Sequence, residues 1–219
     1  IRDLLRIGSP DAPAIGAPER EPLTYAELNA LVDDIGRSLN DFGIGRNDRV
    51  AIVLPNGPEM AAAFVAIGAN ATTAPLNPGY REDEFTFYLE DLSAKALVVL
   101  EGDDTPAIAS AAKLNVPVLR LSVPSGAPAG RFELYSDGSS SGRASASGPA
   151  AEEDVALVLH TSGTTSRPKI VPLTHGNVCA SASHIVQTLS LTPPDRCLNI
   201  MPLFHIHGLI AATLSSLAA

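Results

Sequence analysis

Apolar residues recur at spacings of three and four over residues 25–42, which is the period of one face of an α-helix. Thr24, followed three residues later by Glu27, forms a capping-box pattern, and Gly43 and Gly45 supply a stop. The pattern therefore predicts an amphipathic helix over 25–42 that packs one face into a core. That face consists of Leu28, Leu31, Val32, Ile35, Leu39 and Phe42.

Short apolar runs alternate with helical patterns after this first helix. The predicted strands cover residues 49–54, 71–75, 96–100 and 116–121. The predicted helices cover 81–92, 105–114 and a segment that begins at Pro58. Strands and helices that take turns at this spacing form βαβ units. The sequence therefore predicts an α/β fold with a mainly parallel sheet flanked by helices on both faces.

The composition is that of a globular protein without a nucleic-acid partner. Hydrophobic residues make up 45% and charged residues 18% of the 219 positions, which is enough apolar material to bury a core. A formal net charge of −9 opposes binding to a phosphate backbone, and no Trp is present to stack on bases. Cys179 and Cys197 lie far apart with no C-x-x-C pair, which signals neither a disulfide framework nor a metal site. We therefore expect a reducing compartment: the cytoplasm or, in a eukaryote, the peroxisome.

A Gly/Ser-rich segment at 136–150 separates two regions of different charge, and its composition is typical of a surface loop or linker. We expect a first α/β subdomain at 1–135 and the start of a second at 151–219. Residues 1–159 carry 12 Lys and Arg against 23 Asp and Glu, whereas 160–219 carry three basic residues against one acidic residue. An anionic ligand is expected in the second region, although a buried segment that simply lacks acids has the same pattern.

The most apolar stretches, 60–69 and 208–219, fall short of the roughly 20 residues that cross a bilayer. The second stretch reaches the last residue as a helical pattern without a cap or a polar tail. We therefore expect no transmembrane segment, a fragment of a longer protein, and an exposed apolar face on this last helix.

The segment richest in chemistry is a loop between two predicted strands at 155–159 and 169–173. Its hydroxyl groups, backbone N–H groups and cation are the donors that a polyphosphate needs. The spacing is not that of a Walker A loop, and the loop leads into a strand instead of a helix. A strand–loop–strand phosphate cradle and a plain hydrophilic hairpin tip both fit these residues. The loop contains Thr161, Ser162, Gly163, Thr164, Thr165, Ser166 and Lys169.

Residues 161–169, TSGTTSRPK, resemble the phosphate-binding signature of the adenylate-forming superfamily of AMP-binding enzymes, which usually reads TSGTTGxPKG. MPLFHIHG at 201–208 resembles the family's P-x-F-H segment beside the acyl pocket. LTYAELN, VAIVLPNGPEM and APLNPGY are further similarities, so the resemblance covers essentially the whole chain. Its motifs are most similar to those of oxalate–CoA and 4-coumarate–CoA ligases. Ser166 and Ile170 replace usual glycines, and Ile170 requires an ordinary β conformation.

The resemblance implies part of the large N-terminal domain of an acyl-CoA synthetase. Such enzymes activate a small-molecule carboxylic acid with ATP as an acyl-adenylate and then transfer it to coenzyme A. An adenylation domain that loads a carrier protein and a non-catalytic nucleotide-binding homologue are the alternatives. The family's magnesium-binding Glu has no match here, so the Mg²⁺ ligand is expected beyond Ala219 and the fragment is expected to be inactive alone. The residues that match the phosphate-binding positions are Thr161, Ser162, Gly163, Thr164, Thr165 and Lys169, the last with a catalytic role as a cation.

The resemblance also assigns roles to two histidines. His205 matches the family histidine at the pocket mouth, where a neutral imidazole can donate to the substrate carboxylate. His207 resembles variants in enzymes for short dicarboxylic acids, since an imidazole can protonate to pair with a second carboxylate. Capping of the following helix is the alternative for His207. The other histidines are interpreted as packed residues: His160, His175 and His184.

Overall fold

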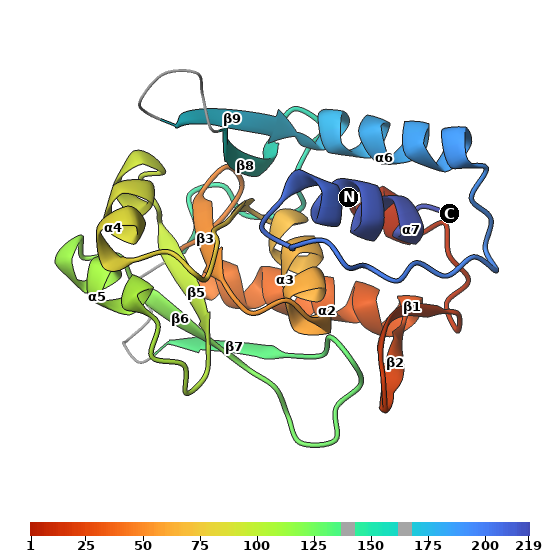
Figure 1. Ribbon diagram of the computed structural model, residues 1–219, viewed down its shortest axis with the longest axis horizontal. Helices are drawn as coiled ribbons and strands as arrows, with labels where there is room; N and C mark the ends of the chain where they lie inside the picture. Colours follow the sequence, from red (N-terminus) through yellow and green to blue (C-terminus); the bar gives the residue numbers. More distant parts are fainter. Residues whose placement is uncertain (137–142, 162–167) are drawn as a thin grey trace.

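A computed structural model describes residues 1–136, 143–161 and 168–219. Over these residues, one sheet has the strand order β7-β6-β5-β3-β4-β8-β9 (Figure 1). The central pairs are parallel, and the edge pairs β6–β7 and β8–β9 are antiparallel. The predicted α/β fold with a mainly parallel sheet is confirmed. The strands are β3 (Arg49–Val53), β4 (Thr72–Pro75), β5 (Ala96–Leu100), β6 (Val118–Ser122), β7 (Glu133–Ser136), β8 (Val155–Thr161) and β9 (Lys169–Thr174).

Helices cover both faces of the sheet, and the alternation of side chains along β3 separates the two layers. Val50 and Ile52 pack with α2, α3 and α6, whereas Ala51 and Val53 pack with α4 and α5 on the opposite face. All four residues are buried, so burial of apolar surface on both sides holds this strand at the centre. The helices are α2 (Tyr25–Asp41), α3 (Pro58–Gly68), α4 (Glu82–Asp91), α5 (Pro106–Lys113) and α6 (His175–Leu189).

The start of α2 is specified by the predicted capping box. The Thr24 hydroxyl accepts from the Glu27 backbone N–H at 3.2 Å, and the Glu27 carboxylate accepts from the Thr24 N–H at 2.8 Å. The hydrophobic pattern did not predict α1 (Arg2–Leu5) or the hairpin of β1 (Pro13–Ala17) and β2 (Arg20–Thr24). Glu19 takes a φ of 58° in that turn, a left-handed backbone conformation that a glutamate does not predict.

The β8–β9 hairpin joins the sheet through the parallel contact of β8 with β4. The register places Thr73 beside Leu157. Thr72 Oγ1 donates to the Val155 carbonyl at 2.6 Å, and Thr73 Oγ1 donates to the Ala156 carbonyl at 2.8 Å. Both threonines are fully buried, so their hydroxyls are paired with carbonyl groups away from water. These bonds hold β8 in register beside β4.

Strands from both sides of the Gly/Ser-rich segment share the sheet, since β7 precedes the segment and β8 follows it. Residues 137–142 of that segment lie outside the described residues. In its described part, the Ala146 carbonyl accepts from the Arg46 N–H at 2.9 Å. This part therefore lies against the loop before β3, and the division into two subdomains stays a prediction.

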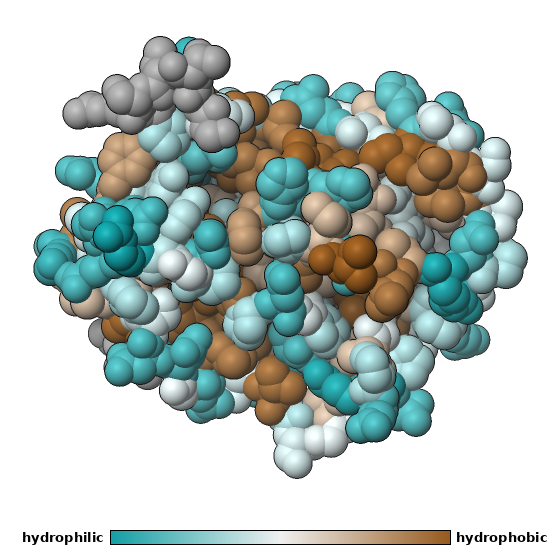
Figure 2. Space-filling model, viewed as in Figure 1, coloured by the Kyte–Doolittle hydropathy of each residue, from teal (hydrophilic) through white to brown (hydrophobic). Residues whose placement is uncertain are grey.

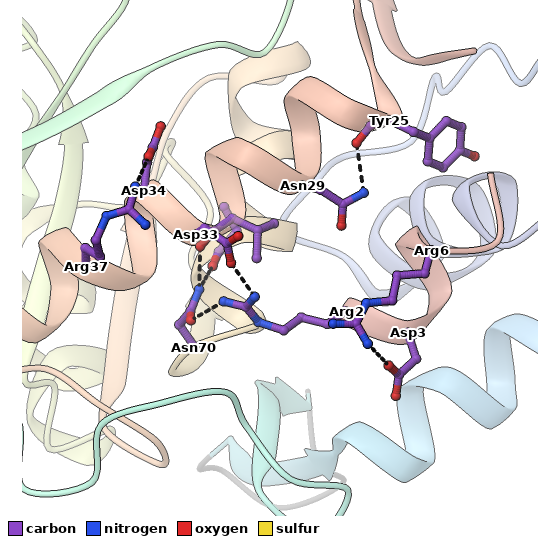
Figure 3. A network of polar contacts seen from close by, with 11 residues as sticks. Arg2, Asp3, Arg6, Tyr25, Asn29, Asp33, Asp34, Arg37 and Asn70 are labelled. Carbon is purple, nitrogen blue, oxygen red and sulfur yellow. Dashed lines mark hydrogen bonds and ion pairs between the residues drawn. The ribbon is translucent and has the colours of Figure 1, made fainter. Parts of the chain in front are cut away.

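A polar network ties α1, α2 and α3 together on one side of the sheet (Figure 3). Asn70, just after α3, donates to the Val32 and Ala66 carbonyls, both at 2.9 Å, and accepts from Arg2 at 2.9 Å. A Cβ at Gly36 would lie 2.5 Å from Asn70 Oδ1, so α2 needs a glycine at this point. The network fixes the helical layer against which β3 packs.

The C-terminal segment forms a π-helix, η1 (His207–Leu214), followed by α7 (Ser215–Leu217). The expectation of an exposed apolar face here is wrong, because Leu209, Leu214 and Leu217 are buried in the core that η1 and α7 share with α3 and α6. Exposed apolar side chains lie instead around the connection between α6 and η1, where Figure 2 shows apolar surface. They are Leu189, Leu198, Ile200 and Ile206. In the described parts of the chain, no helix is long and apolar enough to span a bilayer.

Replacing Thr73 with valine keeps its shape but removes the hydroxyl that pairs with the Ala156 carbonyl. We expect Thr73→Val to lower the free energy of unfolding by about 1 to 3 kcal/mol, because a buried acceptor loses its partner. Urea unfolding measures this change. Thr188→Val, at an exposed position of α6, is the control and is expected to change stability by less than about 0.5 kcal/mol. Equal stabilities for the wild type and Thr73→Val would contradict the role of the hydroxyl.

Candidate functional site

The sheet topology points to the carboxyl ends of the central parallel strands as the candidate place for a ligand. The chain leaves β3 toward α3 on one face and leaves the adjacent β4 toward α4 on the other face. In open α/β sheets, ligands bind outside the carboxyl ends of the strands where successive connections change face. Because β8 runs parallel to β4, Thr161 at the end of β8 lies at these same carboxyl ends.

The β8–β9 hairpin brings together two of the residues that the sequence predicted. Thr161 ends β8, Lys169 begins β9, and the two are cross-strand partners with exposed side chains. Ile170 lies within β9 and is not among the described residues with positive φ, so the ordinary β conformation expected of it is confirmed. The hairpin thus presents a hydroxyl and an ammonium group side by side. Four further predicted residues lie outside the described residues: Ser162, Gly163, Thr164 and Thr165.

His160, one residue before the end of β8, fastens the hairpin to α4. Its Nε2 lies 3.0 Å from Asp91 Oδ2, and its ring meets the Tyr88 ring edge-on at a centroid distance of 4.7 Å. Tyr88 in turn stacks on Tyr80 at 4.9 Å. Burial raises the pKa of Tyr80, and the neighbouring Tyr88 hydroxyl adds to the increase. With its side chain 7% exposed, His160 is a packed residue, as the sequence analysis interpreted it.

The other two histidines outside the P-x-F-H segment lie on α6. His175 is buried at the start of the helix, and burial lowers the pKa of its imidazole to about 4. This histidine is therefore neutral near pH 7, in agreement with a packed role. His184 is exposed on the same helix, so its interpretation as a packed residue is wrong.

His205 lies in a tight turn between the α6 connection and η1. The His205 N–H donates to the Pro202 carbonyl at 3.1 Å, and the His205 carbonyl accepts from Leu209 N at 3.2 Å. The turn is attached to the sheet by Asn56, which follows β3: Asn56 Oδ1 accepts from Leu203 N at 2.9 Å. This bond places the His205 segment beyond the carboxyl end of β3, on the side of the sheet where β8 ends at Thr161.

Asn56 was not among the site residues predicted from the sequence. It lies within the segment VAIVLPNGPEM, which was noted only as a similarity. Its position in the short loop after a buried strand was the available signal, since loops at the carboxyl ends of parallel strands carry ligand sites.

The backbone also selects the tautomer of His205. The His207 N–H donates to His205 Nδ1 at 3.3 Å. In a neutral imidazole, a nitrogen that accepts carries no proton, so the ring proton is on Nε2. His205 is exposed and is therefore able to donate from Nε2 to an external carboxylate.

The alternative role considered for His207, capping of the following helix, is wrong. His207 is the first residue of η1, the N-cap is Ile206, and no side chain caps the helix. The His207 imidazole is exposed beside His205 and makes no capping bond.

Two other features of the structure do not favour phosphate or metal. A hollow of about 850 Å³ lies between β2 and the β6–β7 connection, but Glu19 and Glu21 line it, and its Arg20 is paired with Glu59 at 2.7 Å. Across the ranges 1–136, 143–161 and 168–219, no group of three or more His, Cys, Asp or Glu side chains is placed to hold a metal ion.

Comparison with known proteins decides the family. The sequence profile described as AMP-binding enzyme matches residues 8–219. The chain belongs to this family. The predicted membership of the adenylate-forming superfamily is confirmed, and the α/β architecture is that of the N-terminal domain of such AMP-binding enzymes.

Several AMP-binding enzymes are similar over most of this chain. Probable CoA ligase CCL9 of Humulus lupulus is 40% identical over 198 residues, which are 90% of this chain and 38% of the relative. Oxalate–CoA ligase of Arabidopsis thaliana is 39% identical over 214 residues, 96% of this chain and 41% of the relative. MatB from Rhodopseudomonas palustris, solved both without ligand and with ATP bound, has a TM-score of 0.80 at 28% identity and covers 100% of this chain. The chain spans 38% to 44% of the length of these relatives.

Gly208 is the residue that lets η1 approach the turn carrying His205. A Cβ at this position would lie 2.5 Å from the Pro202 carbonyl oxygen and 3.1 Å from that of Met201. We expect Gly208→Ala to lower the free energy of unfolding by about 1 to 3 kcal/mol, because backbone must move to admit the methyl group. Urea unfolding is the measurement. Gly16→Ala is the matched control, since its Cβ would meet nothing closer than 3.9 Å; equal effects of the two variants would argue against a close approach at Gly208.

Proposed function

We propose that the full-length protein is an ATP-dependent acid–CoA ligase and that this chain supplies its phosphate-binding hairpin and the mouth of its acid pocket. One observation carries the proposal: Thr161 and Lys169 are cross-strand partners on the sheet edge to which Asn56 also attaches the His205 turn. A phosphate-binding group and a carboxylate-binding group are thereby directed to the same side of the sheet. The similarity to named CoA ligases and to the ATP-bound MatB structure supports the same assignment.

The reaction proceeds in two steps, transfer of the adenylyl group to the acid and then transfer of the acyl group to coenzyme A. A carboxylate oxygen of the acid attacks the α-phosphorus of ATP, the bond to the β-phosphate oxygen breaks, and pyrophosphate leaves. The sulfur of coenzyme A then attacks the acyl carbon of the adenylate, AMP leaves, and the thiol proton passes to solvent. Both transfers need positioning and charge neutralisation at phosphate oxygens more than covalent help from the protein.

Each predicted residue has a role in this scheme. The Lys169 ammonium neutralises charge on the β- and γ-phosphates as pyrophosphate forms, and Thr161 donates a hydroxyl to them. Neutral His205 donates from Nε2 to the carboxylate of the acid and orients the attacking oxygen. We expect Mg²⁺ to accompany ATP, with its protein ligand outside this chain; the cytoplasmic or peroxisomal location also stays a prediction. The loop residues proposed to donate to phosphate are Ser162, Gly163, Thr164 and Thr165.

Removing the cation tests the phosphate site. We expect Lys169→Ala in the full-length protein to lower kcat/KM for ATP. The expected loss of transition-state stabilisation is about 2 to 4 kcal/mol, the usual value for one preorganised charge-stabilising group. Thr165→Val is expected to have an effect of the same kind. Lys95→Ala is the matched control, because Lys95 is exposed at the amino end of β5, on the opposite edge of the sheet. Pyrophosphate release at varied ATP is the assay, and an unchanged kcat/KM in both Lys169→Ala and Thr165→Val would rule out the assignment.

The acid is proposed to be small and dicarboxylic. His207 is exposed next to His205 and is free of a capping role, so its imidazole is available to a second carboxylate. The similarity to an oxalate–CoA ligase over 96% of the chain favours this choice of substrate.

A panel of acids tests the substrate. We expect pyrophosphate release with oxalate or malonate to exceed that with acetate, coumarate or palmitate. His207→Ala should reduce this preference by about tenfold, the loss expected for one charge-assisted hydrogen bond, while leaving acetate unaffected. Selective use of palmitate would contradict the dicarboxylate proposal, and a preference unchanged in His207→Ala would remove this residue from substrate binding.

A further inference from the structure

We propose that Asn56 is a positioning residue for the acid-binding mouth, because its side chain holds the turn that carries His205 at the carboxyl end of β3. The inference rests on the proposed ligase function for its kinetic consequence, but the bond itself is structural. Asn56 Oδ1 accepts from Leu203 N at 2.9 Å and joins residues 147 positions apart. His205 follows two residues after that donor.

Asn56 is itself held by regular structure on both sides. Leu54, two residues before it, is buried directly after β3. Gly57, directly after it, is the N-cap of α3, and Pro58 opens that helix. β3 and α3 fix the backbone on either side of Asn56. Its side-chain oxygen Oδ1 is therefore a rigid acceptor at the carboxyl ends of the strands, where successive connections change face.

The segment that Asn56 holds is attached to the fold at Leu203, through the buried side chain of this residue and through its N–H, which donates to Asn56. Between α6 and η1, Leu198 and Ile200 are 85% and 81% exposed, so these large side chains do not anchor it. Leu203, at 5% exposure, is the buried side chain of the P-x-F-H segment. Among the hydrogen bonds described for residues 191–206, the bond from Leu203 N to Asn56 is the one that reaches a distant part of the fold.

This attachment bears directly on His205. The turn closes locally through the bond from His205 N to Pro202, and the His205 imidazole is oriented by the His207 N–H. Both bonds move with the turn, so they set the shape of the turn but not its place on the sheet. The Asn56 bond and the buried Leu203 side chain set that place, and loss of the bond should displace the Nε2 donor from the acid without altering the phosphate hairpin.

Two variants of Asn56 separate the acceptor from the rest of the side chain. Asn56→Ala removes the oxygen, whereas Asn56→Asp keeps an oxygen that accepts from Leu203 N. We expect Asn56→Ala in the full-length protein to raise KM for the acid about 3- to 10-fold, as for one lost hydrogen bond, with KM for ATP changed less than about twofold. Asn56→Asp should stay within about twofold of the wild type for both substrates.

The matched kinetic control is Asn29→Ala. Asn29 also donates from its side chain to backbone, to the Tyr25 carbonyl at 2.8 Å, but it lies on α2 away from the His205 turn. It should leave both KM values unchanged. Equal increases in the two KM values of Asn56→Ala, or failure of Asn56→Asp to restore the acid KM, would overturn the positioning role.

Hydrogen–deuterium exchange tests the bond without activity. Peptides that cover residues 201–208 of the unliganded protein should exchange about 3- to 10-fold faster in Asn56→Ala than in the wild type or Asn56→Asp, since an anchoring bond is lost. Unchanged exchange in Asn56→Ala would overturn the proposal outright. If no acid supports pyrophosphate release in the wild type, the ligase function fails, whereas faster exchange would still establish Asn56 as the anchor of this turn.

Discussion

The contact between β4 and β8 is the interaction on which the site depends. The central strands would form a sheet without it, but the hairpin that ends in Thr161 and begins again at Lys169 would have no fixed place on that sheet. Thr72 and Thr73 use buried hydroxyls to satisfy carbonyls of β8, and an unpaired buried carbonyl costs free energy. A parallel register held by buried polar bonds resists slipping, so Thr161 at the end of β8 has a defined position at the carboxyl ends of the parallel strands.

Two side chains extend this constraint to the surface on either side of β4. On the hairpin, His160 pairs with Asp91 and packs on Tyr88, which ties the last turn of α4 to the strand that bears the proposed phosphate donors. Beside β3, Asn56 receives the Leu203 N–H and thereby brings a segment almost 150 residues later to the same edge. The proposed phosphate and acid sites are thus fixed independently, by different bonds to the same sheet. That independence is what allows their kinetic effects to be separated.

The charge of Lys169 and the tautomer of His205 bear on the two proposed ligands. The chain has a net charge of −9, yet the hairpin mouth presents an ammonium group, so the local field at Lys169 favours phosphate against the background of the molecule. At the other site, the His207 N–H donates to His205 Nδ1, so the proton of the neutral form of this imidazole lies on Nε2. Because backbone geometry fixes this donor, it needs no rearrangement to bind the proposed carboxylate substrate. Such preorganisation is what the proposed acyl-activation reaction requires.

Local patterns in the sequence determined the parts of this protein that depend on neighbours along the chain. The capping box of α2, the apolar runs of β3 and β5 and the strand character of Ile170 follow from side-chain periodicity and backbone preference, and the structure bears them out. The family followed from motif strings, because close similarity of sequence reflects common structure. The hairpin at Glu19, the burial of the last helix and the anchoring role of Asn56 were decided only in the tertiary structure. Each depends on a partner remote in sequence or on a backbone conformation that the residue type does not favour, and the free energy of such contacts is absent from any local pattern.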